Sequence, residues 1–537
     1  MKDMKPTNWT GRDDAMVEAA IRRGASRREL LKMLMASGVA LSAGGSVLLR
    51  AGQAVAATPV SGGSLKAAGW SSSTADTLDP AKASLSTDYV RCCAFYNRLT
   101  FLDEGGQVQM ELAESISTDD AMTWEVKLRK GVLFHDGHTL SADDVVFSLK
   151  RHLDEAVGSK VNSIAKQMAE ITKVDDTTVK IVLTAANADL PTILSLHHFM
   201  IVADGTTDFS KGNGTGPFIC ESFEPGVKSV AVKNPDYFKS EGPYLDSFEF
   251  FAITDNNARV NALLSNDIQL AASVNPRSLR MLEGQPTVQT SVTTAGNYTD
   301  LNIRLDLEPG DKAGFIEGMK HLINREAIQK SVLRGLAEIG NDQPVSAANR
   351  YHNPNLKPRE FDPEKAKALF EKAGVMGQSI PIVASEAATS SIDMAVVVQQ
   401  AGAEIGMNFY VEGVAPDGYW SNYWLKSPIH FGNINPRPTP DILFSLLYAS
   451  DAPWNESQFK SDKFDSMMVE ARGTLDEERR KAIYWEMQEM VANDAGTIIP
   501  AYISNVDAIS SKLKGLKANP LGGMMGYAFA EYVWLEA

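Results

Sequence analysis

Two small groups of side chains have the residue types for chemistry: His135 and His138 flank Asp136, and Asp143 and Asp144 follow shortly after. Imidazole and carboxylate groups at this spacing suggest a metal site, and adjacent carboxylates suggest general acid–base catalysis. A helix that begins here explains the two aspartates better, because acidic side chains are favourable in a helix's first turn. The chain also has no G-x-S-x-G, Walker-type phosphate loop or H-E-x-x-H motif.

The three cysteines, Cys92, Cys93 and Cys220, are a second candidate for chemistry. No spacing of cysteine and histidine matches a zinc site. In an oxidising compartment Cys220 could form one disulfide, either with Cys92 or with Cys93. We favour the alternative, in which the cysteines stay unpaired and are buried as small apolar side chains.

The segment Ser26–Lys32 carries the paired arginines Arg27 and Arg28 just before a mildly apolar run, Met33 to Leu49, and the chain then reaches a small-residue end at Ala54–Ala57. This pattern is typical of a bacterial twin-arginine export signal. We expect cleavage near Ala57 and a mature protein that works in the periplasm. An amphipathic cytoplasmic helix is the disfavoured alternative, because it would not end in an A-x-A-like site.

The segments that follow the predicted signal do not have the pattern of a membrane-spanning helix or of a lipid anchor. The apolar run of the signal is short and diluted by serine and glycine, and we find no later segment that is long and apolar enough to span a bilayer. No cysteine follows the run, so a lipid anchor is not indicated. We therefore expect a soluble periplasmic protein.

Length and charge restrict the function further. The chain has 537 residues, and 43 Lys and Arg stand against 62 Asp and Glu after residue 57, a net charge of −19. This balance argues against nucleic acid or an anionic lipid surface as the partner, since both require basic patches. About 480 residues are too many for one compact core and suggest two or three domains.

Strand and helix patterns alternate along the mature chain. Trp124 to Leu128 alternates apolar and polar residues, as in a half-buried strand. A turn at Asp136-Gly137 precedes a helix capped by Ser141. Gly314 to Leu333 reads as one helix, and Asp476 to Val491 as another with one apolar face. The mixture predicts an α/β protein.

Several strings occur in a characteristic order along the chain: Leu78–Pro80, Leu112–Ser115, Trp124–Arg129, Gly131–Gly137, Ala142–Arg151 and Gly214–Phe218. This order resembles the extracellular solute-binding family of ABC importers that take up peptides, nickel complexes and opines. Leu301-Asn302, Ile323–Arg325, Asp362–Ala366 and Ile499-Pro500 continue the resemblance, which covers nearly the whole mature chain. The strings Arg437–Asp441 and Tyr448–Asn455 are similar to a proteobacterial branch of peptide or dipeptide binders.

The resemblance implies a two-lobed, type II periplasmic binding protein of the three-domain, peptide-binding subclass. The implied segments are a signal peptide (1–57), a lobe-one sheet domain (58–84, 212–300 and 498–537), a smaller domain on lobe one (85–211) and lobe two (301–497). Two chain crossings, near Leu301-Asn302 and near Thr497, would form the hinge. Ligand would be buried between the lobes when the hinge closes.

The resemblance also implies a function without catalysis. The protein would be the substrate-binding component of an ABC importer, a monomer that captures a peptide or peptide-like solute and delivers it to the membrane permease. In this family the segment with His135 and His138 is a structural strand–turn–helix, so we expect no metal and no cofactor. A twin-arginine-exported cofactor enzyme is the remote alternative, and a chemoreceptor partner or peptide scavenger is not separable from transport by sequence.

Arg437 is the first candidate for the ligand site. It stands among Pro436, Pro438 and Pro440, which stiffen the loop and hold the guanidinium ready for a carboxylate. The alternatives are a surface arginine or an ion pair with Asp441. Family peptide binders place an aspartate in this loop for the ligand's amino group, but here the best register places Pro436 there. This departure favours an acidic solute such as an opine over a generic oligopeptide.

Aromatic and polar residues complete the prediction. Tyr419, Trp420, Tyr423 and Trp424 suit either a cleft or a domain core, and Trp420 is slightly favoured for the cleft. Trp70 and Ser71 follow the first strand, where the family lines its cleft floor, and Tyr96 has a weaker claim. The predicted ligand-binding residues are Trp70, Ser71, Trp420, Arg437, Asp441, Trp454 and Asn455.

Overall fold

The computed structural model describes residues 58–519 and 521–536. The twin-arginine signal predicted for residues 1–57 lies outside these described residues. Residues 61–537 form one compact unit. Among the helices described, none has the length and apolar character needed to cross a membrane.

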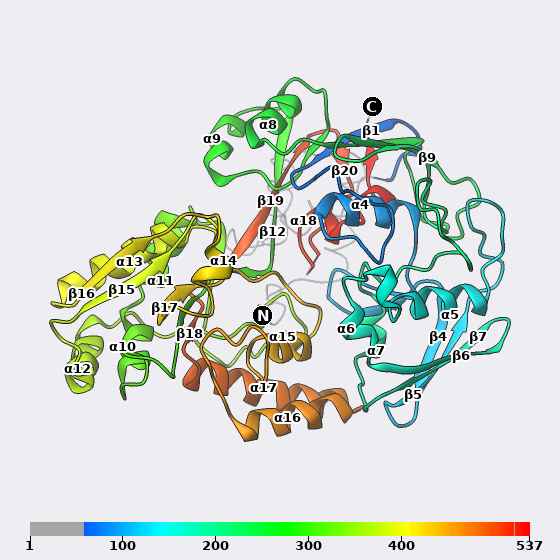
Figure 1. The fold of residues 1–537 in the computed structure, drawn as a ribbon. Helices are drawn as coiled ribbons and strands as arrows, with labels where there is room; N and C mark the ends of the chain where they lie inside the picture. The colour runs from blue at the N-terminus through cyan, green and yellow to red at the C-terminus, as the bar shows by residue number, and fades with distance from the viewer. Residues whose placement is uncertain (1–57, 520, 537) are drawn as a thin grey trace, which may run out of the picture. The chain divides into compact units, whose positions relative to one another are not determined.

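The largest sheet has eight strands, in the order β12-β19-β11-β1-β10-β9-β8, with β14 paired to β19 beside that path (Figure 1). Strand β1 runs parallel to β10, with Ser64 opposite Ser247. The strands are β1 (Ser64–Gly69), β8 (Phe218–Glu224), β9 (Lys228–Lys233), β10 (Ser247–Ala252), β11 (Leu270–Ala271), β12 (Val288–Tyr298), β14 (Ala337–Ile339) and β19 (Ala501–Ser510). Helix α4 (Ser86–Phe95) packs on this sheet through a core that contains Phe218, Phe248 and Phe250.

A second, antiparallel sheet has the order β4-β5-β7-β6. Its strands are β4 (Ala113–Thr118), β5 (Thr123–Leu128), β6 (Met168–Asp175) and β7 (Thr178–Leu183). In β5 every second residue is buried, as the alternation in the sequence predicts. Helix α5 (Ala142–Arg151) packs across the sheet through Val145 and Leu149, and its N-terminus has the predicted cap at Ser141.

The third sheet has five strands in the order β16-β15-β17-β13-β18. Its strands are β13 (Leu301–Ile303), β15 (Ser379–Ala384), β16 (Asn408–Gly413), β17 (Ile429–Phe431) and β18 (Thr497–Ile498). Helices α10 (Phe315–Leu322), α12 (Pro363–Ala373) and α13 (Ser391–Glu404) share its core.

The single helix predicted for Gly314 to Leu333 is wrong in its continuity. The chain leaves the helix at Ile323, and the Asn324 side chain accepts a hydrogen bond from the backbone of Ala327, so that a short new turn, α11 (Arg325–Ala327), begins there. An asparagine that caps a new helix competes with helix continuation.

Three further helices pack around a separate apolar cluster: α15 (Pro440–Leu447), α16 (Asp462–Gly473) and α17 (Glu477–Asp494). The predicted apolar face of α17 is buried there through Ile483, Met487 and Val491. Asp476 caps α17 by accepting a hydrogen bond from the Arg479 backbone, as expected for a helix that begins with acidic residues.

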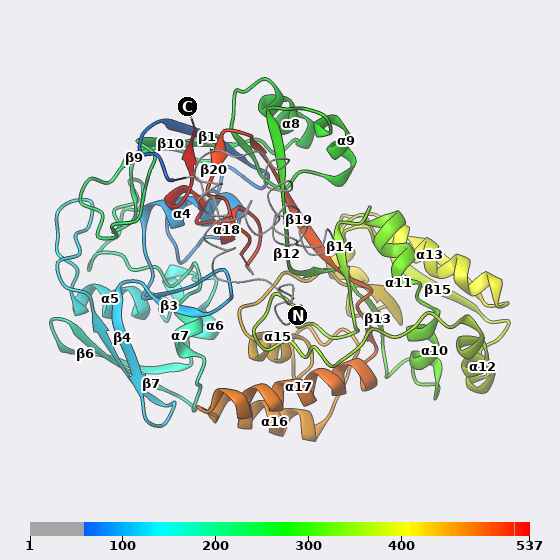
Figure 2. The same ribbon diagram turned by 180° about the vertical axis from the view of Figure 1, so that it is seen from behind.

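Strands β12 and β19 lie side by side and lead directly into the five-stranded sheet (Figure 2). Thr299 and Asp300 join β12 to β13, and Ile499 and Pro500 join β18 to β19. The register of the pair shifts between Thr294 and Asn297. The two connections, at Thr299-Asp300 and at Ile499-Pro500, are the chain crossings that the sequence analysis places near Leu301 and Thr497. The division of the chain into three domains around them stays a prediction.

Candidate functional site

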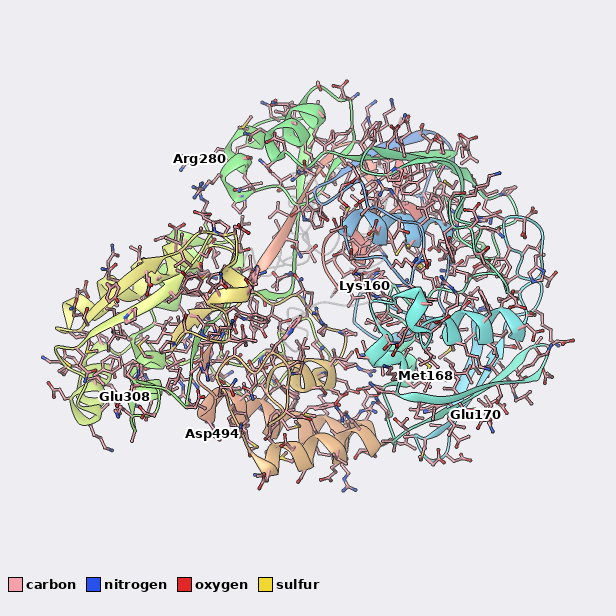
Figure 3. The ribbon with its side chains drawn as sticks, viewed as in Figure 1. Lys160, Met168, Glu170, Arg280, Glu308 and Asp494 are labelled. Atoms are coloured by element: carbon pink, nitrogen blue, oxygen red, sulfur yellow. The ribbon has the colours of Figure 1, made fainter. Side chains whose placement is uncertain are left out.

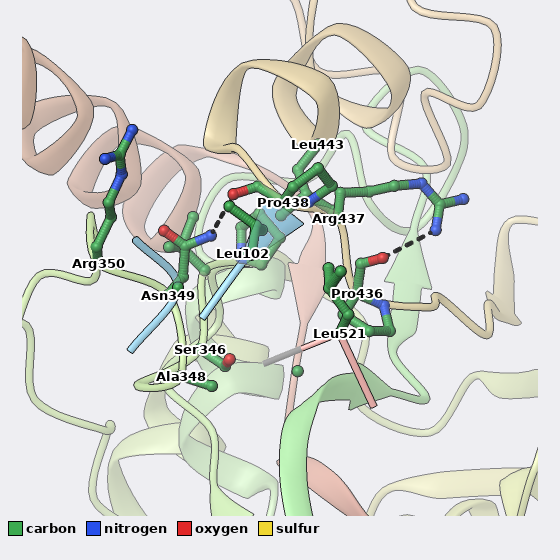
Figure 4. A pocket seen from close by; sticks show the side chains of 14 residues that line it. Leu102, Ser346, Ala348, Asn349, Arg350, Pro436, Arg437, Pro438, Leu443 and Leu521 are labelled. Carbon is green, nitrogen blue, oxygen red and sulfur yellow. Dashed lines mark hydrogen bonds between the residues drawn. The ribbon is translucent and has the colours of Figure 1, made fainter. Parts of the chain in front are cut away.

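A small hollow lies between chain segments that are far apart in the sequence (Figure 4). It is lined by Leu102, Gly106, Gly296, Pro344, Val345, Ser346, Ala348, Asn349, Arg350, Pro436, Arg437, Pro438, Leu443 and Leu521. The lining thus includes the β12 bulge at Gly296, next to the crossings, and two proline-containing loops. Small-molecule sites commonly lie where separate chain segments meet in this way.

The loop that begins at Pro344 is held by local hydrogen bonds. Gln343 donates from Nε2 to the Val345 carbonyl (2.7 Å) and accepts at Oε1 from the Val345 backbone N–H (2.6 Å). Asn349 donates from Nδ2 to the Pro438 carbonyl over 3.3 Å, which joins this loop to the loop that carries Arg437 (Figure 4). Sequence analysis missed Asn349 and Arg350, because no local motif marks them.

Arg437 extends past Pro436 and away from Asn349 (Figure 4). Its Nη1 donates to the carbonyls of Asn435 (3.1 Å) and Pro436 (3.2 Å). Within the described part of the chain, no carboxylate pairs with Arg437 at 4 Å or less. Burial lowers the pKa of this guanidinium, which is the direction expected when a cation loses water without gaining an anion.

Asp441 has a different partner from the one considered in the sequence. It lies in the first turn of α15, and Arg472 on α16 donates from Nε to its Oδ1 over 2.7 Å. Arg472 also donates to the Ser445 hydroxyl. Burial raises the pKa of Asp441 to about 6 even though Arg472 opposes the shift. The proposed role of Asp441 in ligand binding stays a prediction, and its carboxylate already has a cationic partner.

The aromatic group near Trp420 divides into core and surface. Tyr419, in the short helix α14 (Tyr419–Asn422), is fully buried and donates its hydroxyl to the Phe431 carbonyl over 2.7 Å. Trp420 is 41% exposed and meets Trp424 edge-on at 5.5 Å. Trp424 in turn meets Trp454 at 5.6 Å. The structure therefore links two predicted site residues, Trp420 and Trp454, through a third tryptophan.

A buried pair of acids lies beneath these tryptophans. Trp424 donates from Nε1 to Glu456 Oε1 over 2.5 Å, and Glu456 neighbours Asp300 in the crossing between β12 and β13. Burial and the mutual repulsion of the two carboxylates raise the pKa of Glu456 well above its usual value, and burial raises that of Asp300. Gly432 leaves room for both carboxyls, because a side chain there would collide with them. The sequence does not predict this buried pair, because Asp300 and Glu456 are far apart in the chain and neither belongs to a recognisable motif.

Asn455 holds its own loop together. Its Nδ2 donates to the carbonyls of Phe459 (2.6 Å) and Ala449 (3.2 Å), and its Oδ1 accepts from the Phe459 backbone N–H (2.9 Å). The amide thus has partners on both sides. Its role toward a ligand stays a prediction.

Trp70 and Ser71 lie at the end of β1. Trp70 packs on the core of the large sheet and is partly exposed. Ser71 Oγ lies 2.6 Å from Ser86 Oγ, and its carbonyl accepts from Thr87 Oγ1 over 2.6 Å. Ser71 therefore fixes the start of α4. Of the seven predicted site residues, all within the described chain, only Arg437 lines the hollow.

The other candidates for chemistry are structural in this fold. His135 lies with its Nε2 3.0 Å from the Gly216 carbonyl, and Asp144 accepts from Ser141 at the start of α5. In the part of the chain that the structure covers, no group of three His, Cys, Asp or Glu residues could hold a metal ion. Cys92, Cys93 and Cys220 are free thiols; Cys92 and Cys93 are buried, as the favoured alternative predicts, whereas Cys220 is only partly buried.

Comparison with known proteins gives a match to one family model, described as bacterial extracellular solute-binding proteins, family 5 Middle, over residues 107–456. The chain is 26% identical over 471 residues to a dipeptide-binding protein of Escherichia coli, covering 80% of this chain and 87% of the relative. It is equally 26% identical over 471 residues to heme-binding protein A of Haemophilus influenzae, covering 80% and 85%.

A solved structure shows the same fold. The periplasmic binding protein DppA from Helicobacter pylori, in complex with the peptide STSA, superposes with a TM-score of 0.72 at 25% identity. The superposition covers 89% of this chain and 99% of the other. This likeness confirms the α/β fold of the type II periplasmic binding proteins that the sequence predicts.

Proposed function

The chain belongs to the bacterial extracellular solute-binding proteins of family 5, and from this premise we propose that it captures a peptide or peptide-like solute whose carboxylate is bound by Arg437. As a member of that family it is a periplasmic substrate-binding component of an ABC importer. The family resemblance of the sequence is thereby confirmed. The nature of the solute and the residues that hold it are the proposal.

The observation that carries the proposal is the environment of Arg437. The side chain is partly buried, its Nη1 contacts only backbone carbonyls, and no carboxylate of the described residues pairs with it. A desolvated cation without an anion is unfavourable, and a bidentate carboxylate is the partner that a guanidinium binds best. A solute that supplies this carboxylate would therefore gain affinity from a site already in place.

Two solute classes present such a carboxylate. The relatives include proteins named for dipeptides, and one solved relative holds the peptide STSA, which favours a peptide. In the best register of the sequence resemblance, Pro436 takes the place of the aspartate of the family's peptide binders, and Asp441 is paired with Arg472. The second candidate is therefore an acidic, non-peptide solute such as an opine, which would offer its carboxylate to Arg437.

The proposed mechanism is hinge closure without chemistry. Ligand that binds the closed form better shifts the population toward it, and the permease of the importer recognises that form. Micromolar binding corresponds to about −8 kcal/mol. We infer a monomer with no catalytic activity, cofactor or nucleic-acid partner. Export by the twin-arginine pathway, with cleavage near Ala57, belongs to the same proposal.

The experiment that tests this function is native mass spectrometry of the mature protein, followed by denaturing release of what co-purifies. A released peptide mixture or a single carboxylate-bearing solute would support the proposal, and the two results separate the peptide from the opine-like alternative. If the protein converts the released compound enzymatically, or if the bound solute has no carboxylate, the proposed function is contradicted.

A further inference from the structure

The chain segment between the two crossings, residues 301–498, meets the rest of the protein at a second place, away from the crossings. There the Ala188 N–H donates to the Arg472 carbonyl over 2.7 Å. Arg472 lies in the last turn of α16, and Ala188 lies just before the short helix α7 (Leu190–Ile193) (Figure 1). Because the crossings lie elsewhere, a hinge movement about them would open or close this contact.

Asp189 is the charged centre of this second contact. Its Oδ1 lies 3.8 Å from Arg480 Nη2 and 3.9 Å from Arg350 Nη2. Within the described residues, every ion pair that joins segment 301–498 to the rest of the chain involves Asp189. Tyr484 donates its hydroxyl to Asp189 Oδ2 over 3.5 Å. One carboxylate thus bridges the two sides of the contact and faces two guanidinium groups.

The contact at Asp189 is not fully formed. The side chain is buried, yet its Oδ1 has no hydrogen bond from any described residue. Burial raises the pKa of this carboxyl, although Arg480 and Arg350 oppose the shift. A buried carboxylate oxygen without a donor is unfavourable, and a movement of about 1 Å would bring either guanidinium within hydrogen-bonding distance. A slight further closure would therefore complete the ion pairs.

The charged groups are held in position on both sides. The Asp189 N–H donates to Asn187 Oδ1 over 2.9 Å. On the opposite side, Arg480 donates from Nε and Nη2 to the Tyr351 hydroxyl, over 3.0 and 2.6 Å. The Arg350 guanidinium carbon lies 4.7 Å from the centroid of the Tyr351 ring, a favourable cation–π distance. Each partner is thus oriented before the ion pairs are complete.

Arg350 connects this contact to the candidate ligand site. It lines the hollow, and so does Leu102, which belongs to the same side of the contact as Asp189 (Figure 4). Arg350 Nη1 also donates to Gln107 Oε1, on that same side, over 3.4 Å. A solute in the hollow and the carboxylate of Asp189 therefore border the same arginine.

From this geometry we propose that Asp189 is a latch that holds the closed form through hydrogen-bonded ion pairs with Arg350 and Arg480. The inference rests on the proposed function in one respect, since it requires capture by hinge closure. Asp189 is a positioning residue, because it acts through the two arginines and has no contact with solute. A solute that favours the closed form would increase the population in which the latch is formed.

The test traps the latched form with a disulfide. A β-carbon placed on Gly473, the last residue of α16, would lie 3.8 Å from that of Ala186, which is a typical distance in disulfides. Ala186→Cys with Gly473→Cys therefore cross-links only while the two sides are in contact. All variants also carry Cys220→Ala, because Cys220 is the partly buried native thiol. Non-reducing electrophoresis follows the rate of cross-linking under mild oxidation, and mass spectrometry identifies the linked peptides.

We expect the double-cysteine protein to cross-link, and the dipeptide Ala-Phe to accelerate the reaction. Asp189→Asn should slow it about tenfold, because the amide has the same size but no charge for the two arginines. Helix α7 loses no cap, since the Asp189 side chain makes no capping hydrogen bond. Asp189→Lys should slow the reaction further, because a third cation would face Arg350 and Arg480.

The matched control is Asp143→Asn, which should keep the parental rate. Asp143 pairs with Lys173 over 2.8 Å, and both residues lie on the same side of the contact as Asp189. Loss of a carboxylate near the introduced thiols would by itself favour thiolate and accelerate the reaction. A slower reaction in the Asp189 variants therefore reports the contact and not the reactivity of the thiols.

Two results would overturn the latch. One is cross-linking at the parental rate or faster in both Asp189→Asn and Asp189→Lys. The other is a double-cysteine protein that does not cross-link with or without Ala-Phe, because the two sides would then not meet at this place.

The outcomes also separate the latch from the function on which it rests. If Ala-Phe neither binds nor changes the rate while both Asp189 variants slow it, the latch stands and the peptide function is contradicted. If Ala-Phe binds and accelerates cross-linking, and the rates are the same with and without the Asp189 substitutions, the proposed function stands and the latch is wrong.

Discussion

Arg472 Nε lies 2.7 Å from Asp441 Oδ1, and this ion pair joins the first turn of α15 to the last turn of α16. Asp441 is 5% exposed, so its carboxylate depends on that partner. Among the described residues, Asp441 is therefore not the partner of Arg437, although only four positions separate the two.

We predict that Arg472→Ala lowers the free energy of unfolding by about 1–3 kcal/mol, because it leaves a buried carboxylate without its hydrogen-bonded cation. The measurement is urea unfolding at pH 7. Arg479→Ala is the matched control, since Arg479 pairs with Glu470 on the surface and such pairs contribute about 0–1 kcal/mol. A loss for Arg472→Ala no larger than that of the control would contradict the account of this pair.

The buried acids Asp300 and Glu456 predict a pH dependence of stability. Carboxyls whose pKa is raised in the folded state hold protons that the unfolded chain releases, so the contribution of these two groups to stability is full at low pH and is lost as pH rises from the usual carboxyl pKa through the raised one. Asp441, with its pKa raised to about 6, adds a loss in the window from about pH 4 to pH 6.

Glu456→Gln should reduce the fall in stability above pH 5, because the amide stays neutral and still accepts from Trp424. Urea unfolding at pH 5 and pH 8 measures the difference, with Glu412→Gln on exposed β16 as the control. An unchanged difference between the two pH values in Glu456→Gln would mean that Glu456 is ionised in the folded protein.

The export signal gives a prediction outside the described structure. Arg27→Lys together with Arg28→Lys should abolish export, because the paired arginines are the feature that a twin-arginine signal requires. Immunodetection of the protein in periplasmic and cytoplasmic fractions measures this. Normal recovery of the double variant from the periplasm would overturn the assignment of the pathway.

Sequence patterns predicted those helices and strands that are determined by residues close together in the chain. The alternation from Trp124 to Leu128 and the cap at Ser141 correspond to β5 and the start of α5. The break at Asn324 was missed, because an asparagine inside an otherwise helical pattern marks a new cap only when its side chain is seen to bond the next turn. Domain boundaries stay predictions.

The candidate ligand site around Arg437 could be predicted from the sequence only in part. The proline-rich loop singled out Arg437, but the sequence did not show that Asp441 pairs instead with Arg472, 31 positions further along the chain. The rings of Tyr89 and Tyr527, whose centroids lie 5.3 Å apart, belong to segments that are more than 400 residues apart in the chain. Contacts of this kind have no local pattern, so only the fold reveals them.

Arg437→Ala is predicted to weaken binding of the solute at least tenfold while leaving the melting temperature nearly unchanged. The reason is that, among the described residues, its hydrogen bonds reach only the carbonyls of its own loop, those of Asn435 and Pro436. Thermal unfolding and titration calorimetry measure the two effects. Arg280→Ala is the control, since Arg280 lies at the outer surface on α9 (Leu279–Leu282) (Figure 3). A large drop in melting temperature would assign Arg437 to the fold rather than to the ligand.

The most direct test of the account compares a dipeptide such as Ala-Phe with its C-terminal amide in the wild-type protein and in Arg437→Ala. If Arg437 binds the carboxylate, the wild type prefers the free acid at least tenfold, and Arg437→Ala binds acid and amide with nearly equal, weak affinity. A preference for the acid that persists in Arg437→Ala, or a wild type that binds both equally, would contradict the central claim.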